Sequence, residues 1–325
     1  MSGIGDPLRA RIAAGGPIAV DEYIETANAH YYATRDPLGL AGDFITAPEI
    51  SQMFGEIVGA ALCDVWVRAG RPPDAVYAEL GPGRGTLAED ALKVMRRAGF
   101  TGSVHFIETS DTLRATQAKR VPDAKSHCST ATLPKVPILL VANEFFDALP
   151  IRQWIGSAAR CVTHDGARFQ FTHNGPIRED SPARQATTLA LAHHLAEHGG
   201  AALIIDYGYC GGEHGDTLQA VRAHGFADPL ERPGEQDLTA HVDFQALASA
   251  ARSEGVRVSS AVTQGGWLET LGIGARAATL AARNPDQTEA IATARRRLSD
   301  EDEMGRLFKV IGLTAVNWPR IAGLE

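Results

Sequence analysis

Apolar residues recur at helical spacing in two segments near the start of the chain. They do so in residues 20–32, and again from Met53 to Val65, where they lie three or four positions apart. Gly70 and the pair Pro72–Pro73 end the second segment. Residues 1–72 are therefore predicted to form an N-terminal helical extension.

Beyond residue 73 the pattern changes to short apolar runs that alternate with helical segments. The runs typical of strands are residues 75–80, 103–107, 124–128, 137–142 and 201–205, and the helical segments among them are 86–98 and 109–120. Alternation of β and α at this spacing predicts a doubly wound parallel sheet, so residues 73–325 are expected to form one α/β domain.

Three segments interrupt the alternating pattern and are predicted to be insertions. They are residues 151–180, 208–242 and 264–304. The first contains a predicted antiparallel hairpin that turns at Asp165–Gly166. The second is long and rich in Gly, Pro and His, which favours a functional or disordered loop. The third is predicted to hold two or three helices, with a break at Asn284–Pro285. A helix over 243–253 and strands over 256–262 and 307–313 complete the domain.

Composition and charge exclude several classes of function. The 325 residues include 31 Lys and Arg against 39 Asp and Glu, a net charge of -8, which argues against a broad nucleic-acid surface. The four cysteines form no C-x-x-C pair, as expected for reduced thiols. No apolar run reaches the ~18–20 residues of a membrane span, and residues 1–20 lack an apolar leader core. We therefore expect a cytoplasmic protein without a membrane span.

A glycine-rich turn between the first predicted strand and helix is the strongest local signal. It contains Glu79, Gly81, Gly83 and Gly85 in the pattern acid-x-G-x-G-x-G. Glycines there allow a sharp turn and a close approach of a ligand to the backbone. A dinucleotide fingerprint would need a third glycine at Thr86, which disfavours NAD. The turn resembles the first motif of Rossmann-like methyltransferases that use S-adenosylmethionine. That resemblance implies that Glu79 lies near the amino-acid part of the cofactor.

Glu108 ends the second predicted strand, 23 residues beyond Gly85. A carboxylate at this position can accept both hydroxyls of a ribose, as in dinucleotide enzymes. Glu108 therefore supports an adenosine ligand, although it does not separate NAD from S-adenosylmethionine.

Seven longer stretches resemble one family, the MidA-like protein methyltransferases, which include the mitochondrial arginine methyltransferase that assists complex I assembly. These stretches cover residues 42–55, 79–87, 142–150, 205–209, 215–219, 233–243 and 304–309. The most distinctive are Gly-Asp-Phe-Ile-Thr-Ala-Pro-Glu-Ile-Ser-Gln-Met-Phe-Gly (42–55) and Ala-Asn-Glu-Phe-Phe-Asp-Ala-Leu-Pro (142–150). Because the ordered set spans residues 42–309, the resemblance extends over most of the chain.

The resemblance implies a class I, Rossmann-like fold and transfer of a methyl group from S-adenosylmethionine to an arginine of a partner protein. By the same resemblance, the partner is expected to be a subunit of a respiratory complex. The start of the sequence does not read as a mitochondrial presequence, which favours a bacterial-type member. A mitochondrial location is expected only for a eukaryotic source.

An arginine acceptor needs carboxylates, because its guanidinium group is cationic and its lone pair is delocalised. Candidates should follow parallel strands, where open α/β sheets place their ligands. Glu144 and Asp147 follow the fourth strand, and a helical turn would put them on one face. Asp206 follows the fifth strand. These three are the candidate catalytic residues, and Asn143 is assigned to the cofactor.

Each candidate also has a purely structural interpretation. Glu144 and Asp147 could be acids favoured by a helix dipole, and Asp206 a turn residue. The loop with Asp43, Thr46 and Glu49 could cover the cofactor, but helix capping by Thr46 and Glu49 is favoured.

The histidines also have more than one interpretation. The helix with His193, His194 and His198 lacks H-E-x-x-H, so a polar face is favoured over a metal site. His241 could approach the substrate or bind local backbone.

Two other functions remain open at this point. One is a cofactor-binding assembly factor with weak or no catalysis, which the presence of both the glycine turn and Asn143–Glu144 disfavours. The other is an NAD-linked oxidoreductase, which Thr86 disfavours.

Overall fold

The structure is a computed structural model, and it describes residues 4–34, 45–212, 215–222 and 225–325. The chain divides into two compact units. Unit 1 is built from residues 1–45, 146–187 and 211–242, and unit 2 from residues 46–145, 188–210 and 243–325.

This division does not follow the expected boundary at residue 72. Helix α4 (Gln52–Arg68) belongs to unit 2, because 11 of its 17 residues are buried and it packs along α5 (Thr86–Arg97). Two of the three predicted insertions lie mostly in unit 1 together with the N-terminal helices, whereas the third, residues 264–304, is part of unit 2.

A nine-stranded mixed sheet forms the centre of unit 2. Its main path runs in the order β16-β18-β11-β5-β2-β3-β4. The strands on this path are β16 (Arg257–Val258), β18 (Phe308–Thr314), β11 (Gly200–Tyr209), β5 (Ile138–Asn143), β2 (Val76–Leu80), β3 (Val104–Ile107) and β4 (Lys125–His127). Strands β11, β5, β2, β3 and β4 are parallel, and β18 runs antiparallel to β11. The predicted α/β sheet is therefore confirmed.

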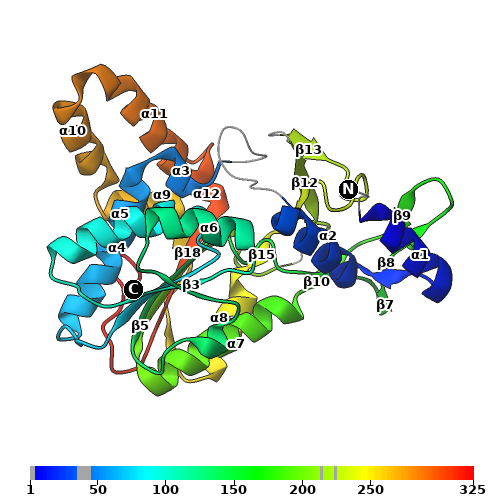
Figure 1. Cartoon of the computed structure of the whole chain (residues 1–325), viewed down its shortest axis with the longest axis horizontal. Coiled ribbons are helices and arrows are strands. Elements are labelled where there is room, and N and C mark those ends of the chain that lie inside the picture. Colours follow the sequence, from blue (N-terminus) through cyan, green and yellow to red (C-terminus); the bar gives the residue numbers. More distant parts are fainter. Residues whose placement is uncertain (1–3, 35–44, 213–214, 223–224) are drawn as a thin grey trace. The chain divides into compact units, whose positions relative to one another are not determined.

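Helices cover both faces of this sheet. Helices α4, α5 and α6 (Asp111–Arg120) lie on one face, and α7 (Pro182–His198) and α8 (Phe244–Ser253) on the other (Figure 1). Every residue of β2, β3 and β5 is buried, which explains why these strands appear in the sequence as unbroken apolar runs.

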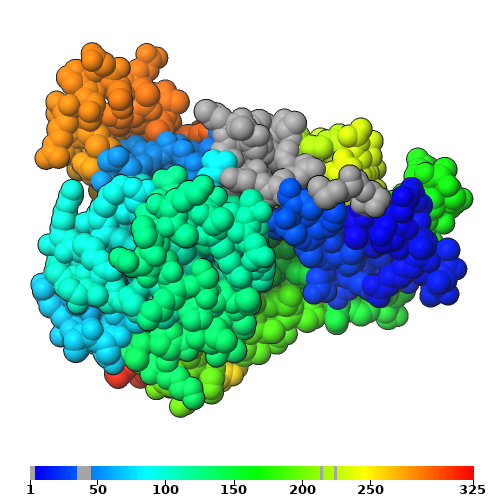
Figure 2. Space-filling view, viewed as in Figure 1, coloured from blue at the N-terminus to red at the C-terminus, as the bar shows by residue number. Residues whose placement is uncertain are grey.

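The predicted break at Asn284–Pro285 separates two helices of unit 2. Helix α9 (Gln264–Thr270) is followed by α10 (Ile273–Arg283), α11 (Thr288–Ser299) and α12 (Met304–Leu307). Helices α10 and α11 form a hairpin, drawn in orange in Figure 2, that stands out from the rest of unit 2. Glu56 of α4 and Arg276 of α10 anchor it through two short bonds, Nε–Oε2 at 2.6 Å and Nη2–Oε1 at 2.7 Å.

Unit 1 has its own hydrophobic core. Helices α1 (Gly5–Gly15) and α2 (Val20–Thr34) belong to it with three small antiparallel sheets. The sheets are β1 (Ile18–Ala19) with β8 (Cys161–His164) and β9 (Phe169–Phe171); β10 (Arg178–Asp180) with β6 (Arg152–Ile155) and β7 (Ala158–Ala159); and β12 (Gln219–Arg222) with β13 (Gly225–Ala227) and β14 (Asp237–Thr239). The β8–β9 pair is the hairpin expected at Asp165–Gly166.

Two predicted elements differ in detail. The helical segment expected from Met53 to Val65 lies in α4, and a separate short helix, α3 (Ala47–Ile50), precedes it. The two are separate because Ser51 is extended and its Oγ caps α4 by accepting from the amide of Met53 at 3.2 Å. The strand expected over 256–262 is only β16 and the short β17 (Val262–Thr263). Among the helices described, none is long and apolar enough to cross a membrane.

Candidate active site

Three of the predicted cofactor residues lie at the carboxyl ends of the parallel strands. Glu79 is the residue before the last one of β2, Glu108 follows β3, and Asn143 is the last residue of β5. Because β2, β3 and β5 are neighbouring parallel strands, their carboxyl ends meet at one edge of the sheet. In open α/β sheets this is the edge at which ligands bind.

The glycine turn has a backbone that residues with a side chain rarely adopt. Gly81, Gly83 and Gly85 have φ angles of +58°, +52° and +79°. At Gly81 an added Cβ would lie 2.9 Å from Cδ2 of Phe145. The turn therefore requires glycine at Gly81 both for its backbone angle and for the approach of Phe145.

Glu79 is buried, with 3% of its surface exposed, and its carboxylate accepts a bond of 2.7 Å from the hydroxyl of Tyr77. Burial raises its pKa to about 8, although the Tyr77 bond acts in the opposite direction. Because the pKa of Glu79 is higher in the folded than in the unfolded chain, its protonation stabilises the fold. This stabilisation is complete below the unfolded-state pKa and is lost as the pH rises through about 8. A nearby cation would favour the ionised form, so Glu79 is suited to a positively charged ligand group.

Glu108 is fixed by the start of α6. Its Oε1 accepts from the amides of Thr109 and Ser110, both at 2.8 Å. Burial raises the pKa of Glu108, and the two amide bonds oppose that rise. Its carbonyl oxygen accepts from the guanidinium of Arg114. Oε1 is thus occupied by two amides, whereas Oε2 has a long bond of 3.4 Å from Nε2 of Gln117 and remains the atom for a ligand.

Gln117 is a site residue that the sequence analysis missed. Its Nε2 donates to the carbonyl oxygen of Gly83 at 2.7 Å and lies 3.4 Å from Oε2 of Glu108. The signal that could have found it is a glutamine four residues after Leu113 on the buried side of α6. A buried polar side chain on an apolar stripe needs a polar partner.

Asn143 and Glu144 form the end of β5. Asn143 Nδ2 and the amide of Ala47 each donate to Oε1 of Glu144 at 3.0 Å. Glu144 has a φ of +50°, a left-handed angle that costs free energy in a residue with a side chain. Such strain is concentrated at functional sites.

The predicted helical turn that would align Glu144 with Asp147 is absent: residues 144–150 form bends and turns. Because no helix forms here, a helix dipole does not explain this pair of acids.

Asn143 also offers an acceptor without a partner. Its side chain is 8% exposed, and no group in the described part of the chain donates to its Oδ1. A buried amide oxygen without a donor is unusual, and a bound amino or guanidinium group would satisfy it. Together with Glu79, the glycine turn and Glu108, this atom fits a ligand with a cationic amino group at one end and a ribose at the other.

Helix α3 is attached to the glycine turn. Oε1 of Glu49 accepts from the hydroxyl of Thr86, and Oε2 lies 3.8 Å from Nη1 of Arg84. Thr46 occupies the N-cap position of α3 and Glu49 lies in its first turn, as expected, but the Thr46 side chain makes no capping bond. The third residue named for this loop, Asp43, lies outside the described residues.

Asp206 is placed differently from the expectation. Strand β11 continues to Tyr209, so Asp206 lies within the strand and is fully buried. Its Oδ2 accepts from the amide of Phe145 at 3.2 Å, and its Oδ1 from the amide of Tyr207 at 3.0 Å. These bonds give Asp206 a part in holding the turn after β5.

Asp147 belongs to unit 1. Its Oδ1 accepts from the amide of Ala148 at 2.8 Å, and its side chain is 7% exposed. Buried Arg184 donates to the carbonyl oxygens of Phe146, Asp147, Ala240 and His241, and so joins two backbone segments of unit 1, residues 146–147 and 240–241. His241 is therefore held through its backbone.

The three histidines of α7 bind protein groups. His194 lies 3.0 Å from the carbonyl oxygen of Val136, and His193 lies 3.3 Å from a carboxylate oxygen of Glu254. The rings of His194 and His198 pack edge to face, 4.8 Å apart. In the described parts of the chain, no group of three or more His, Cys, Asp or Glu could hold a metal ion.

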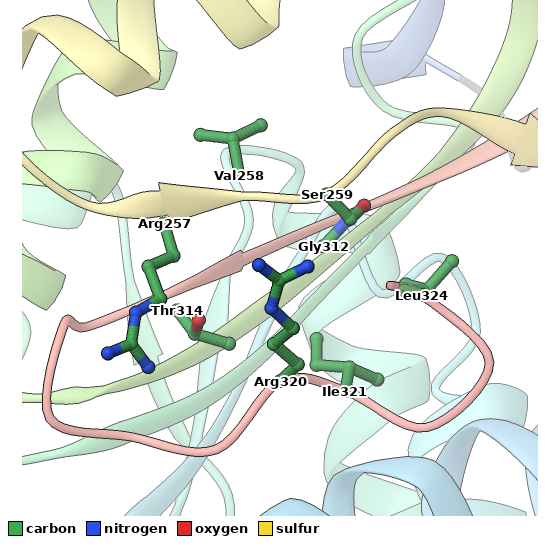
Figure 3. Close-up of a pocket in the computed structure, with 8 residues that line it drawn as sticks. All are labelled: Arg257, Val258, Ser259, Gly312, Thr314, Arg320, Ile321 and Leu324. Atoms are coloured by element: carbon green, nitrogen blue, oxygen red, sulfur yellow. The ribbon is translucent and has the colours of Figure 1, made fainter.

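A small pocket lies at the other edge of the sheet, near Thr314 at the end of β18 (Figure 3). Thr314 pairs with Ala201, near the start of β11, so this pocket is remote from the carboxyl ends of the parallel strands. Its volume of ≈ 10 Å³ is room for about one water molecule. It is too small for a nucleoside.

The chain is similar to known methyltransferases. The family described as "Putative S-adenosyl-L-methionine-dependent methyltransferase" matches residues 57–181 and 157–262. A solved structure from Burkholderia thailandensis, bound to S-adenosyl-homocysteine, is 26% identical with a TM-score of 0.84. The similarity covers 99% of this chain and 92% of that one.

Curated relatives are similar over almost the whole chain. The protein arginine methyltransferase NDUFAF7 homologue of Drosophila melanogaster is 35% identical over 94% of this chain and 83% of its own length. NDUFAF7 of Danio rerio is 33% identical over 98% and 88%. Both are named mitochondrial, so they give no support to the cytoplasmic location expected from the sequence. The chain belongs to the same family as these relatives and is an S-adenosylmethionine-dependent methyltransferase.

Proposed function

We propose that the protein transfers a methyl group from S-adenosylmethionine to an arginine side chain of a partner protein. The observation that carries the proposal is the strained Glu144 at the carboxyl ends of the parallel strands. It is held beside Asn143 Oδ1, to which no group of the described residues donates. The names of the curated relatives, protein arginine methyltransferases, support the choice of acceptor.

The proposed cofactor site uses the residues at the ends of β2, β3 and β5. Glu79 and Asn143 receive the amino-acid end, the turn with Gly81, Gly83 and Gly85 lies along the middle, and Glu108 accepts from the ribose. When bound, S-adenosylmethionine supplies a methyl group on a positively charged sulfur. The chain needs little acid–base chemistry for this transfer, so its main contribution is alignment.

Glu144 is the residue proposed to hold the acceptor. A carboxylate binds a guanidinium group strongly and keeps the positive charge on the nitrogens that do not react. The amides of Ala47 and Asn143 fix the carboxylate through Oε1. Asp206 is given a positioning part, because it binds the amide of Phe145 next to Glu144. A catalytic part for Asp147 stays a prediction.

The proposed partner is a protein, and by the family resemblance a subunit of a respiratory complex. The proposed location is the cytoplasm for a bacterial source and the mitochondrion for a eukaryotic one.

Methyl transfer from labelled cofactor tests this proposal. The purified protein is incubated with a cell extract and S-adenosylmethionine labelled in the methyl group, and the labelled products are hydrolysed and identified by mass spectrometry. We expect the label on arginine within protein. Label on lysine or on a small molecule would contradict the arginine acceptor. Absence of label in every extract would instead favour an assembly factor that binds the cofactor without catalysis.

Binding of S-adenosylhomocysteine near pH 7 is expected to release protons. With a pKa of about 8, Glu79 is about nine-tenths protonated at pH 7 in the free protein. An ammonium group placed beside it would lower that pKa and expel the proton. Calorimetry in two buffers of different ionisation enthalpy measures the number released, which should be about 0.5–0.9. Glu79→Gln should abolish the buffer dependence, and an enthalpy independent of buffer in the wild type would contradict the placement of the amino group.

A further inference from the structure

Gln117 occupies a defined position between the glycine turn and Glu108. Its side chain is 1% exposed, and its Nε2 donates to the carbonyl oxygen of Gly83. A carbonyl oxygen can only accept, so the NH₂ group of the amide must face Gly83. This bond fixes the orientation of the amide and leaves Oε1 as the atom on its other side.

The acceptors of Glu108 are too few for a whole ribose diol. A carboxylate oxygen has two lone pairs, and those of Oε1 already accept from the amides of Thr109 and Ser110. Oε2 lies 3.4 Å from Nε2 of Gln117, a long and weak bond, and so has one strong position left. A ribose diol brings two hydroxyl donors. One of them therefore needs an acceptor other than Glu108.

Oε1 of Gln117 is such an acceptor. It is buried, and no donor in the described residues reaches it. We propose that Gln117 is a second ribose-binding residue, whose Oε1 accepts from one hydroxyl of the diol while Glu108 Oε2 accepts from the other. The pair would then select nucleoside ligands with an intact diol. This inference rests on the placement of the cofactor in the proposed function.

A merely structural role for Gln117 predicts a different result. If its amide only tied α6 to the glycine turn, its loss would weaken every ligand of the site equally. If Oε1 binds a hydroxyl, substitution of Gln117 should cost no affinity for the ligand that lacks that hydroxyl. Analogues of S-adenosylhomocysteine without the 2′- or the 3′-hydroxyl separate the two roles.

The experiment is calorimetry of the full chain with S-adenosylhomocysteine and both deoxy analogues. Gln117→Leu removes the amide at nearly constant volume, and Gln117→Met is a second variant of the same kind should the first fail to fold. Gln245→Leu, on the exposed side of α8, is the matched control. We expect Gln117→Leu to bind S-adenosylhomocysteine about tenfold more weakly than the wild type does. For one of the two deoxy analogues, the affinities of Gln117→Leu and of the wild type should agree within about twofold.

An equal loss for all three ligands, or no loss for S-adenosylhomocysteine, would overturn the inference. Glu108→Gln, measured with the same ligands, separates its failure from that of the proposed site. If only Glu108→Gln weakens binding, Gln117 is not a ribose residue, although the cofactor placement holds. If neither variant weakens binding, the placement itself is wrong, and the inference falls with it.

Discussion

Gly81→Val is expected to weaken the binding of S-adenosylhomocysteine by at least about 100-fold. Two effects add at this position. The φ of +58° is unfavourable for a branched residue, and the first carbon of the new side chain would lie 2.9 Å from Phe145. Either the turn or Phe145 must move, and both belong to the edge of the sheet where the cofactor is placed. Calorimetry gives the dissociation constant, and thermal unfolding shows whether the fold survives.

Gly99→Val is the matched control for this change. Gly99 also has a positive φ, +94°, but it is exposed and follows α5, and an added Cβ would meet only the end of the Arg71 side chain, at 3.6 Å. This variant should lose stability and keep its affinity. Normal binding by a folded Gly81→Val protein would mean that the glycine turn is not part of the cofactor site.

Glu144→Gln is expected to lower the rate of methyl transfer by at least about 100-fold while affinity for S-adenosylhomocysteine stays within a few-fold. The change preserves shape, and the amide oxygen can still accept from Ala47 and Asn143. What it removes is the negative charge that holds the guanidinium group. Initial rates of label transfer from S-adenosylmethionine to protein measure the effect on catalysis. Calorimetry with S-adenosylhomocysteine measures the effect on affinity.

Glu254→Gln serves as the control, because Glu254 lies next to His193, away from the carboxyl ends of the strands. It should leave the rate unchanged. A wild-type rate for Glu144→Gln would remove Glu144 from the proposed acceptor site, whereas equal losses of rate and of cofactor affinity would assign it to the cofactor instead.

The sheet could be predicted from the sequence because its central strands are buried on both faces. A strand such as Ile138–Asn143 appears as an unbroken apolar run, and Glu79 and Glu108 stand out because they end such runs. Such patterns depend only on neighbouring residues in the chain, so they can be recognised in the sequence alone.

Features that depend on contacts between distant segments could not be predicted. Gln117 reaches Gly83 across 34 positions, and Glu144 accepts from Ala47 across 97. Asp206 was expected at a strand end, but pairing with Lys309 of β18 extends the strand beyond it. The assignment of residues 146–187 and 211–242 to unit 1 likewise depends on packing with α1 and α2, which no periodicity reveals.

The placement of the cofactor is tested most directly by a crystal structure of this protein with S-adenosylhomocysteine. We predict that the ribose hydroxyls lie within hydrogen-bond distance of Glu108 Oε2 and Gln117 Oε1, and that the amino group lies beside Asn143 Oδ1 and Glu79. A ligand bound with its ribose away from Glu108, or at any place other than the carboxyl ends of β2, β3 and β5, would contradict the account.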